Sequence, residues 1–220
     1  MAIKENLTEI KNSFKNPDCL LIAVSKTKPV EDLLEAYEAG VRDFGENKVQ
    51  EMVEKYETLP KNIRWHLIGH LQKNKVKYMA SFVHLIHSVD SEGLLKEINK
   101  QAAKHNRVIP CLLQIHIAQE DTKFGMDEHE ALQILETYQD KFPHVEVKGL
   151  MGMATFTEDE NQIRKEFQYL KSLFEKFKSH HSGLEILSMG MSGDYPIAME
   201  EGSTMVRVGS SIFGERNYAN

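Results

Sequence analysis

Residues 19–45 read CLLIAVSKTKPVEDLLEAYEAGVRDFG and establish the pattern that the rest of the chain repeats. The apolar run at 19–25 is typical of a buried strand. The amphipathic stretch at 30–39 begins after Pro29 and ends before a glycine, the usual positions of these residues at helix ends. A second strand-like run follows at 41–45. A strand, a helix and another strand in close succession predict a crossover connection in a parallel sheet.

The alternation of strand and helix patterns continues to the end of the chain. Eight strands are expected, at 19–25, 41–45, 63–68, 83–89, 109–117, 145–150, 184–187 and 204–208. Helices are expected at 30–39, 47–57, 74–79, 91–105, 127–142, 158–177 and 196–201, with an additional one at 3–14. We therefore predict an α/β fold, a single (β/α)8 TIM-type barrel over residues 1–220 with an extra N-terminal helix. A doubly wound open sheet is the alternative, but the first turn, SKTKP at 25–29, lacks its usual glycines.

Composition and charge exclude several classes of protein. The 27 Lys and Arg residues against 33 Asp and Glu residues give a formal net charge of −6, whereas nucleic-acid binding needs a basic face. No apolar run approaches the roughly 18 residues of a membrane span, and the first residues lack the apolar segment of a signal peptide. Cys19 and Cys111 both lie in apolar runs, which indicates reduced, buried thiols. We expect a cytoplasmic protein with neither a membrane nor a nucleic acid as partner.

The loops after the last two strands are the clearest candidates for a ligand site. Binding sites of these barrels form at the carboxyl ends of the strands, and phosphate is often bound by the last two loops. Gly193 and Gly209 would let the backbone approach an anion, and Ser192, Ser210 and Ser211 would add hydroxyl donors. Ordinary turn formation explains the same residues equally well.

Two lysines follow the first strand at the same end of the barrel. A desolvated lysine loses proton affinity and can form a Schiff base with a carbonyl group. Depth favours Lys26 over Lys28, although both would lie on one face of an extended chain. The alternative is a pair of solvated lysines at a strand end.

Other polar residues have both a structural and a functional interpretation. Asn47 is expected to cap a helix, and it can also contact a ligand. Arg207 lies between two valines in the last strand and needs an acceptor, either a carboxylate or a ligand atom. Trp65 and His66 are expected in the core. No HExxH pattern occurs, so no metal site is predicted.

Eight segments, in chain order, carry a distinctive combination of residues over nearly the whole chain. They are AVSKTKP (23–29), FGEN (44–47), WHLIGHLQKNK (65–75), HSVD (87–90), KFG (123–125), GLMGM (149–153), LSMGMSGD (187–194) and VRVGSSIFGER (206–216). Together they resemble the pyridoxal phosphate homeostasis protein family, also called the YggS/PROSC family. The resemblance implies a single alanine-racemase-like barrel that holds pyridoxal 5′-phosphate.

The resemblance also implies roles for individual residues. Lys26 matches the lysine that forms the Schiff base, and Asn47 matches a residue near the ring oxygen of the cofactor. Arg207 matches the arginine that faces the pyridine nitrogen. Met153 takes the ring-packing position, and Lys123 is placed near the ring-oxygen side. The residues that match the phosphate site are Ser192, Gly209 and Ser210.

The family is regarded as a regulator or carrier of pyridoxal phosphate, involved in intracellular vitamin B6 homeostasis without established turnover. The alternative is a small pyridoxal-phosphate-dependent amino-acid racemase; a third possibility is a sugar-phosphate enzyme with Lys26 as a Schiff-base lysine. An arginine is a poor proton donor, so the ring nitrogen would stay unprotonated and the cofactor would be a weak electron sink. Eight βα units use the whole chain, so we expect no second domain to supply a catalytic tyrosine. Of the seven tyrosines, Tyr195 alone is expected near the barrel mouth. We expect a monomer that exchanges the cofactor with apo-enzymes.

Overall fold

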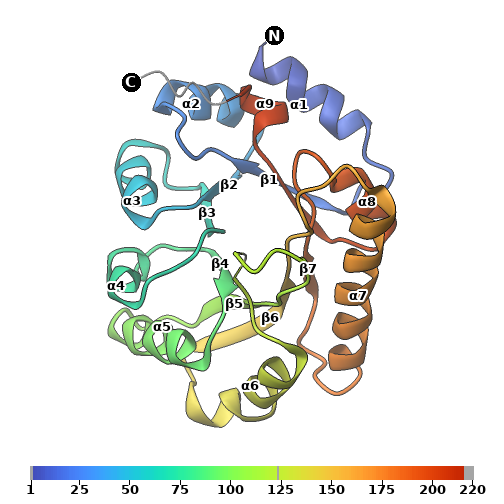
Figure 1. Ribbon diagram of the computed structural model, residues 1–220. Coiled ribbons are helices and arrows are strands. Elements are labelled where there is room, and N and C mark those ends of the chain that lie inside the picture. The colour runs from blue at the N-terminus through green and yellow to red at the C-terminus, as the bar shows by residue number, and fades with distance from the viewer. Residues whose placement is uncertain (1, 123, 216–220) are drawn as a thin grey trace.

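The computed structural model of the protein describes residues 2–122 and 124–215 and places its strands in a closed parallel barrel (Figure 1). Each strand pairs with the next in sequence, and the last pairs with the first. The predicted (β/α)8 barrel is therefore confirmed. The strands are β1 (Leu20–Val24), β2 (Asp43–Glu46), β3 (Arg64–Leu67), β4 (Leu85–Val89), β5 (Ile109–Gln114), β6 (Val145–Met151), β7 (Ile186–Ser188) and β8 (Met205–Val208).

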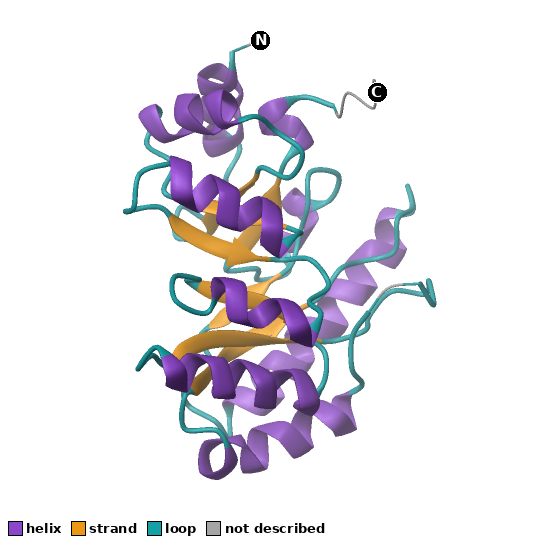
Figure 2. Cartoon of the chain, turned by 90° about the vertical axis from the view of Figure 1, so that its left-hand side faces the viewer, coloured by secondary structure: helices purple, strands orange, loops and turns teal. Residues whose placement is uncertain are grey.

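Helices surround the strands as an outer layer, which Figures 1 and 2 show from two directions. The extra N-terminal helix is present and packs beside the last helix, where Asn6 Nδ2 donates to the carbonyl oxygen of Ile212 at 2.8 Å. The helices are α1 (Ile3–Asn12), α2 (Val30–Glu38), α3 (Val49–Thr58), α4 (Val76–Met79), α5 (Glu92–Lys104), α6 (Glu128–Lys141), α7 (Glu160–Lys178), α8 (Tyr195–Glu200) and α9 (Ser210–Phe213). A short 3₁₀ helix, η1 (Lys73–Lys75), precedes α4.

Apolar side chains fill two separate regions. Successive side chains of a strand point to opposite faces, so each strand serves both regions. One face packs against the helices and includes Cys111 and Leu113 of β5. The opposite face forms a smaller cluster inside the barrel, built on Leu85, Leu112 and Met151. Apolar side chains therefore occupy part of the barrel interior.

The sequence predicted most element boundaries within a few residues, but Asn47 does not cap a helix. The N-cap residue of α3 is Lys48, and its side chain makes no capping hydrogen bond. The reason is that β2 continues through Glu46 and the backbone of Asn47 packs against Gly69, in the loop that follows β3. A Cβ at Gly69 would lie only 2.4 Å from the carbonyl oxygen of Asn47.

Two further differences concern short elements. The strand expected at 109–117 ends at Gln114, and Ile115 forms an isolated bridge with Met126 instead. Helix α9 was not expected, because four residues are too few to show a helical period.

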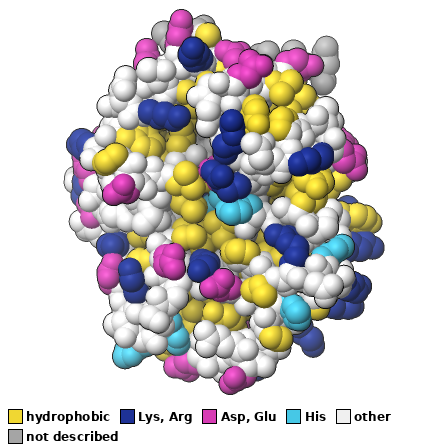
Figure 3. Space-filling model, turned by 180° about the vertical axis from the view of Figure 1, so that it is seen from behind, with side chains coloured by type: hydrophobic (Ala, Val, Ile, Leu, Met, Phe, Trp, Pro, Cys, Tyr) yellow, Lys and Arg dark blue, Asp and Glu magenta, His cyan; other side chains and the backbone are white. Residues whose placement is uncertain are grey.

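The surface carries charges of both signs. Figure 3 shows acidic and basic side chains interspersed over one face, with apolar side chains between them. Within the described part of the chain, no helix combines the length and the apolar character needed to cross a bilayer.

The pairing of β6 with β7 leaves no room for a side chain at Gly149. A Cβ at this position would lie 1.7 Å from the carbonyl oxygen of Ile186. Gly149→Ala should lower the free energy of unfolding by about 3 kcal/mol or more, because β7 must move away. Gly183→Ala is the matched control, since a Cβ there meets nothing within 4 Å, and should change stability by less than about 0.5 kcal/mol. Urea unfolding followed by circular dichroism checks both; equal midpoints would contradict the register.

Candidate functional site

A cavity of about 560 Å³ opens where the carboxyl ends of the strands meet. Its volume falls within the range of roughly 300–1,000 Å³ that is typical of small-molecule sites. It is lined by side chains from the loops after β1, β2, β6, β7 and β8, and by β8 itself. The structure brings together in this cavity seven of the residues proposed from the sequence as ligand contacts, which are Lys26, Asn47, Met153, Ser192, Arg207, Gly209 and Ser210. Ser211, also considered from the sequence as a hydroxyl donor, is exposed and is not among the lining residues.

Lys26 occupies the corner of a tight turn directly after β1. The amide N–H of Lys28 donates to the carbonyl oxygen of Ser25 at 3.1 Å and closes this turn. Thr27 has a φ of +64°, a left-handed conformation that is unfavourable for a β-branched residue. Such strain costs on the order of 1–3 kcal/mol and persists only where surrounding contacts impose it.

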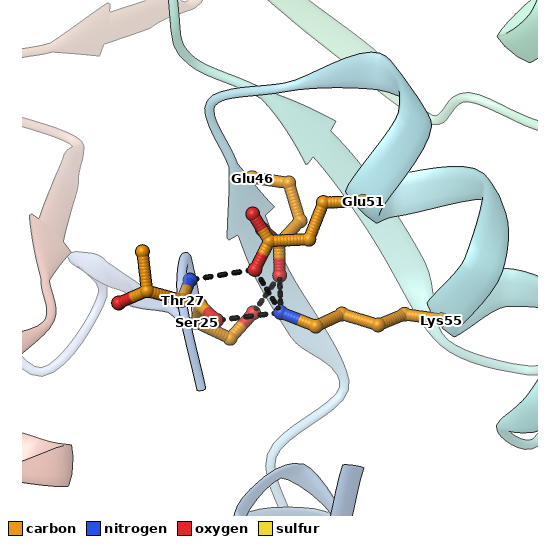
Figure 4. Close-up of polar contacts among 5 residues, drawn as sticks. All are labelled: Ser25, Thr27, Glu46, Glu51 and Lys55. Atoms are coloured by element: carbon orange, nitrogen blue, oxygen red, sulfur yellow. Dashed lines mark hydrogen bonds and ion pairs between the residues drawn. The ribbon is translucent and has the colours of Figure 1, made fainter. Parts of the chain in front are cut away.

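A buried ion cluster imposes the conformation of the turn (Figure 4). Lys55 Nζ donates to the carbonyl oxygen of Ser25 at 2.7 Å and pairs with Glu46 and Glu51 at 2.6 and 2.8 Å. Glu51 accepts the amide N–H of Thr27 at 2.5 Å. The peptide groups on both sides of the intervening lysine are therefore fixed by residues that do not line the cavity.

Glu46 is the buried centre of this cluster. Its Oε1 accepts from Lys55 and also from the Ser25 hydroxyl at 2.6 Å, whereas Oε2 has no hydrogen-bond partner within the described residues. Burial raises the pKa of Glu46 to about 7, although the charge and hydrogen bond of Lys55 act in the opposite direction. The protonation of this carboxyl group therefore changes near neutral pH.

The turn separates the two lysines that the sequence left as alternatives. Lys26 and Lys28 do not share one face of an extended chain, so that expectation is wrong; the left-handed residue between them reverses the backbone. Lys28 Nζ donates to three successive carbonyl oxygens, those of residues 213–215, each at 3.1 Å. The ammonium group of Lys28 thus ties the turn to the end of α9.

The loops after β7 and β8 meet at the cavity through Ser192 and Gly209. The amide N–H of Gly209 donates to Ser192 Oγ at 3.1 Å. A Cβ at Gly209 would lie 3.0 Å from the carbonyl oxygen of Val24, so a larger residue would crowd the end of β1. Ser210, the exposed first residue of α9, adds a second hydroxyl group. Hydroxyl and amide donors of this kind bind phosphate oxygens.

Arg207 lines the cavity from inside the barrel although it is only 3% exposed. Its Nη1 donates to Ser188 Oγ, and its Nη2 donates to the carbonyl oxygen of Gly152 at 3.1 Å. Burial lowers the pKa of Arg207 to about 10, with the charge of Asp194 opposing that shift. The guanidinium group therefore remains protonated at neutral pH, held by two neutral oxygens.

Asn47 and Met153 are partly buried in the cavity wall, and Met153 packs against the apolar cluster inside the barrel. The predicted Lys123 lies outside the described residues. Its neighbour Phe124 lines the cavity and stacks on His70, with ring centroids 3.9 Å apart. This stack places an aromatic surface at the rim of the cavity.

The ion cluster was not expected from the sequence. One signal was available: Glu51 and Lys55 lie four residues apart in a predicted helix, a spacing that favours ion pairs. The third member, Glu46, follows the second strand-like run. Their convergence on the turn after β1 depends on the packing of α3 and could not be predicted from spacing.

The residues Asp43, His66 and His84 bring ligand atoms within 4.8 Å of one another at the opposite end of the barrel. Arg64 already occupies the Asp43 carboxylate through two hydrogen bonds of 2.9 and 2.7 Å. His66 is fully buried, in agreement with the core position expected for it.

The model of the family described as alanine racemase, N-terminal domain, matches residues 1–217. A pyridoxal phosphate homeostasis protein of Aquifex aeolicus is 43% identical over 200 residues, which cover 90% of this chain and 87% of the relative. One of Pasteurella multocida is 39% identical over 100% of both chains. This chain belongs to the pyridoxal phosphate homeostasis protein family. The resemblance seen in the sequence is thereby confirmed.

Solved structures agree with this family assignment. PipY of Synechococcus elongatus with PLP bound is 34% identical, with a TM-score of 0.87 over 96% of this chain and 100% of PipY. The alanine racemase of Bartonella henselae is only 17% identical, with a TM-score of 0.73 over 98% of this chain and 60% of the racemase. The likeness to the racemase shows a common barrel fold.

The raised pKa of Glu46 predicts a pH dependence of stability. The folded state binds more protons than the unfolded state between the ordinary pKa of 4.5 and the folded pKa of about 7. This carboxyl group therefore contributes stability that is fully present below 4.5 and is lost as pH rises through about 7.

Urea unfolding of the wild type and Glu46→Gln at about pH 5 and about pH 8 measures this contribution. The wild type should lose stability between the two conditions, and Glu46→Gln should lose less. Because Lys55 and Glu51 remain, the variant keeps part of the cluster. An identical loss in both proteins would contradict the assignment to Glu46.

Proposed function

We propose that this chain binds pyridoxal 5′-phosphate in the cavity as a Schiff base on Lys26 and serves the homeostasis of this vitamin B6 cofactor without catalytic turnover. The observation that carries the proposal is the composition of one cavity. It combines a lysine at the end of β1 with phosphate-type donors from the loops after β7 and β8, and with a buried arginine on β8.

The relatives support this proposal. Members that are 39–43% identical over 90–100% of this chain are named pyridoxal phosphate homeostasis proteins. PipY, which shares the fold and 34% of the sequence, has a solved structure with PLP bound. Because these proteins match nearly the whole chain, their shared name favours the same role here.

The chemistry of the lining residues fits the cofactor group by group. Bound pyridoxal phosphate supplies an aldehyde that reacts with a primary amine, and Lys26 provides the amine. Ser192, Gly209 and Ser210 provide the hydroxyl and amide donors for the phosphate group. Met153 offers a polarizable apolar surface for the ring. The Asn47 side chain adds an amide donor for the ring oxygen.

The residues of the cavity also support a carrier rather than an enzyme. Racemisation removes a proton from one face of the substrate and returns it on the other, which needs two acid–base groups. Lys26 provides one such group. Among the described residues, no tyrosine lines the cavity, and the hydroxyl of Tyr195 lies 2.9 Å from Ser13 Oγ near α1. An arginine at the ring nitrogen would further limit electron withdrawal by the cofactor.

A small amino-acid racemase is the second candidate, because the fold is shared with alanine racemases. A Schiff-base enzyme acting on a sugar phosphate would use the same lysine and anion site, but the named relatives do not favour it. We further propose that the chain acts as a monomer and exchanges the cofactor with apo-enzymes.

Substitution of the two lysines tests the attachment site. Lys26→Ala should yield colourless protein after incubation with pyridoxal phosphate, because the proposed Schiff-base amine is removed and the Lys28 amine is held by the carbonyl oxygens of residues 213–215. Lys28→Ala should remain yellow, since the ammonium group of Lys28 holds the end of α9. Borohydride reduction followed by peptide mapping measures the labelled residue. A label on Lys28 in the wild type would overturn the assignment.

The proposed lack of turnover is tested by α-proton exchange. Wild-type protein loaded with pyridoxal phosphate should neither exchange the α-proton of alanine or serine in heavy water nor interconvert their D and L forms at a significant rate. Lys26→Ala provides the blank. Steady conversion above about 1 s⁻¹, the low end of ordinary enzyme turnover, would establish the racemase instead.

A further inference from the structure

A line of hydrogen bonds crosses the inside of the barrel and ends on Arg207. Its members lie on β2, β3, β4, β7 and β8. Asp43 Oδ1 is 2.9 Å from His66 Nε2, and His66 Nδ1 is 2.9 Å from His87 Nε2. His87 Nδ1 is in turn 2.9 Å from Ser188 Oγ, which contacts Arg207 Nη1.

This line runs through the interior and not along the barrel wall. Strands β4 and β7 are not neighbours in the closed sheet, so the bond between His87 and Ser188 spans the space that the strands enclose. Both histidines and the serine are fully buried.

The carboxylate end of the line, together with neutral rings, fixes the direction of its hydrogen bonds. An arginine can only donate, so Ser188 Oγ accepts from Arg207 and keeps its own hydrogen for another acceptor. At the other end an ionised carboxylate can only accept. Although burial raises the pKa of Asp43, the hydrogen bonds from His66 and Arg64 outweigh it and leave the pKa at about 2.

The protonation of both rings follows from the Asp43 end. His66 donates to Asp43 from Nε2, so its neutral ring accepts at Nδ1 from His87 Nε2. His87 then carries its proton at Nε2 and accepts at Nδ1 from the Ser188 hydroxyl group. Each ring is neutral in this arrangement, and burial lowers the pKa of both His66 and His87, which favours the neutral forms.

We propose that Asp43, His66, His87 and Ser188 form a one-directional hydrogen-bond chain that positions Arg207 as a permanent donor toward the cavity. Ser188 Oγ and the carbonyl oxygen of Gly152 hold two nitrogens of the guanidinium group.

The consequence for the ligand rests on the proposed function, in which Arg207 faces the pyridine nitrogen. A guanidinium group fixed as donor leaves the ring nitrogen as an unprotonated acceptor, and the oriented chain offers Arg207 no route to give up its proton. The four chain residues touch neither substrate nor cofactor and act through Arg207 alone. They are positioning residues that keep the bound cofactor a weak electron sink.

The first part of the test uses the wild type without cofactor. Nitrogen-15 NMR of protein labelled at histidine distinguishes the Nδ1–H, Nε2–H and doubly protonated rings. We expect His66 and His87 both as the neutral Nε2–H tautomer. A proton on Nδ1 of His87, or a doubly protonated His66, would reverse the chain and overturn the proposal. This measurement needs no variant and does not depend on the ligand.

The second part breaks the chain at the cavity end. Ser188→Ala should allow His87 to adopt either neutral tautomer and should shift the nitrogen-15 signal of ring-labelled pyridoxal phosphate, because Arg207 Nη1 loses its acceptor. Ser88→Ala is the matched control, because Ser88 Oγ is buried on the neighbouring β4 position and makes no hydrogen bond within the described residues. It should leave the tautomers and the ring signal unchanged. Ser188→Thr, which retains the hydroxyl group, should restore the wild-type ring signal.

The third part breaks the chain at its far end. Asp43→Ala should allow His66 and His87 to adopt either neutral tautomer. Asp43→Asn keeps an acceptor for His66 and should preserve the Nε2–H tautomer of both rings. Normal ring-nitrogen signals in both Ser188→Ala and Asp43→Ala would refute the positioning role. Failure of the wild type to take up pyridoxal phosphate would instead refute the proposed function and leave the tautomer result standing.

Discussion

The pairing of β8 with β1 is the constraint on which the site depends. Ile22 lies opposite Arg207 and Ala23 opposite Val208, so the first and last strands end side by side. This closure sets the lysine that follows β1 against the glycine and serine that follow β8. A Cβ at Gly209 would already crowd Val24, which shows how closely the two strand ends approach. An open sheet with the same elements would leave these groups on opposite edges.

The inside of the barrel carries polar groups that an apolar core would exclude. A buried polar group is costly unless it is hydrogen-bonded. Arg207 is tolerated there because Ser188 and Gly152 supply acceptors, and the histidines behind Ser188 are satisfied in turn down to Asp43. A continuous line of hydrogen bonds thus runs through the interior from the cavity to the opposite end of the barrel.

The turn after β1 is controlled from outside the cavity. Lys55 holds one peptide group beside Lys26 and Glu51 holds the other. Their combined hold keeps Thr27 in a conformation that a β-branched residue otherwise avoids. The backbone on both sides of Lys26 is therefore held by a buried ion cluster in which the pKa of the central carboxyl group is raised to about 7. Support of this kind lets a strained backbone persist next to a binding site.

The sequence by itself determined the (β/α)8 barrel, because eight short apolar runs alternate with amphipathic stretches whose ends carry proline, glycine and capping residues. It also indicated the end of the barrel where Lys26, Arg207 and the small residues of the last loops would gather, since the carboxyl ends of parallel strands share one edge. Depth along the first strand favoured Lys26 over Lys28, but local patterns could not reveal the left-handed turn at Thr27 that separates them, because side chains from α3 impose it. They could not reveal the line from Asp43 to Arg207 either. That line is made by contacts between strands distant in sequence, and only closure of the barrel brings them within hydrogen-bonding distance.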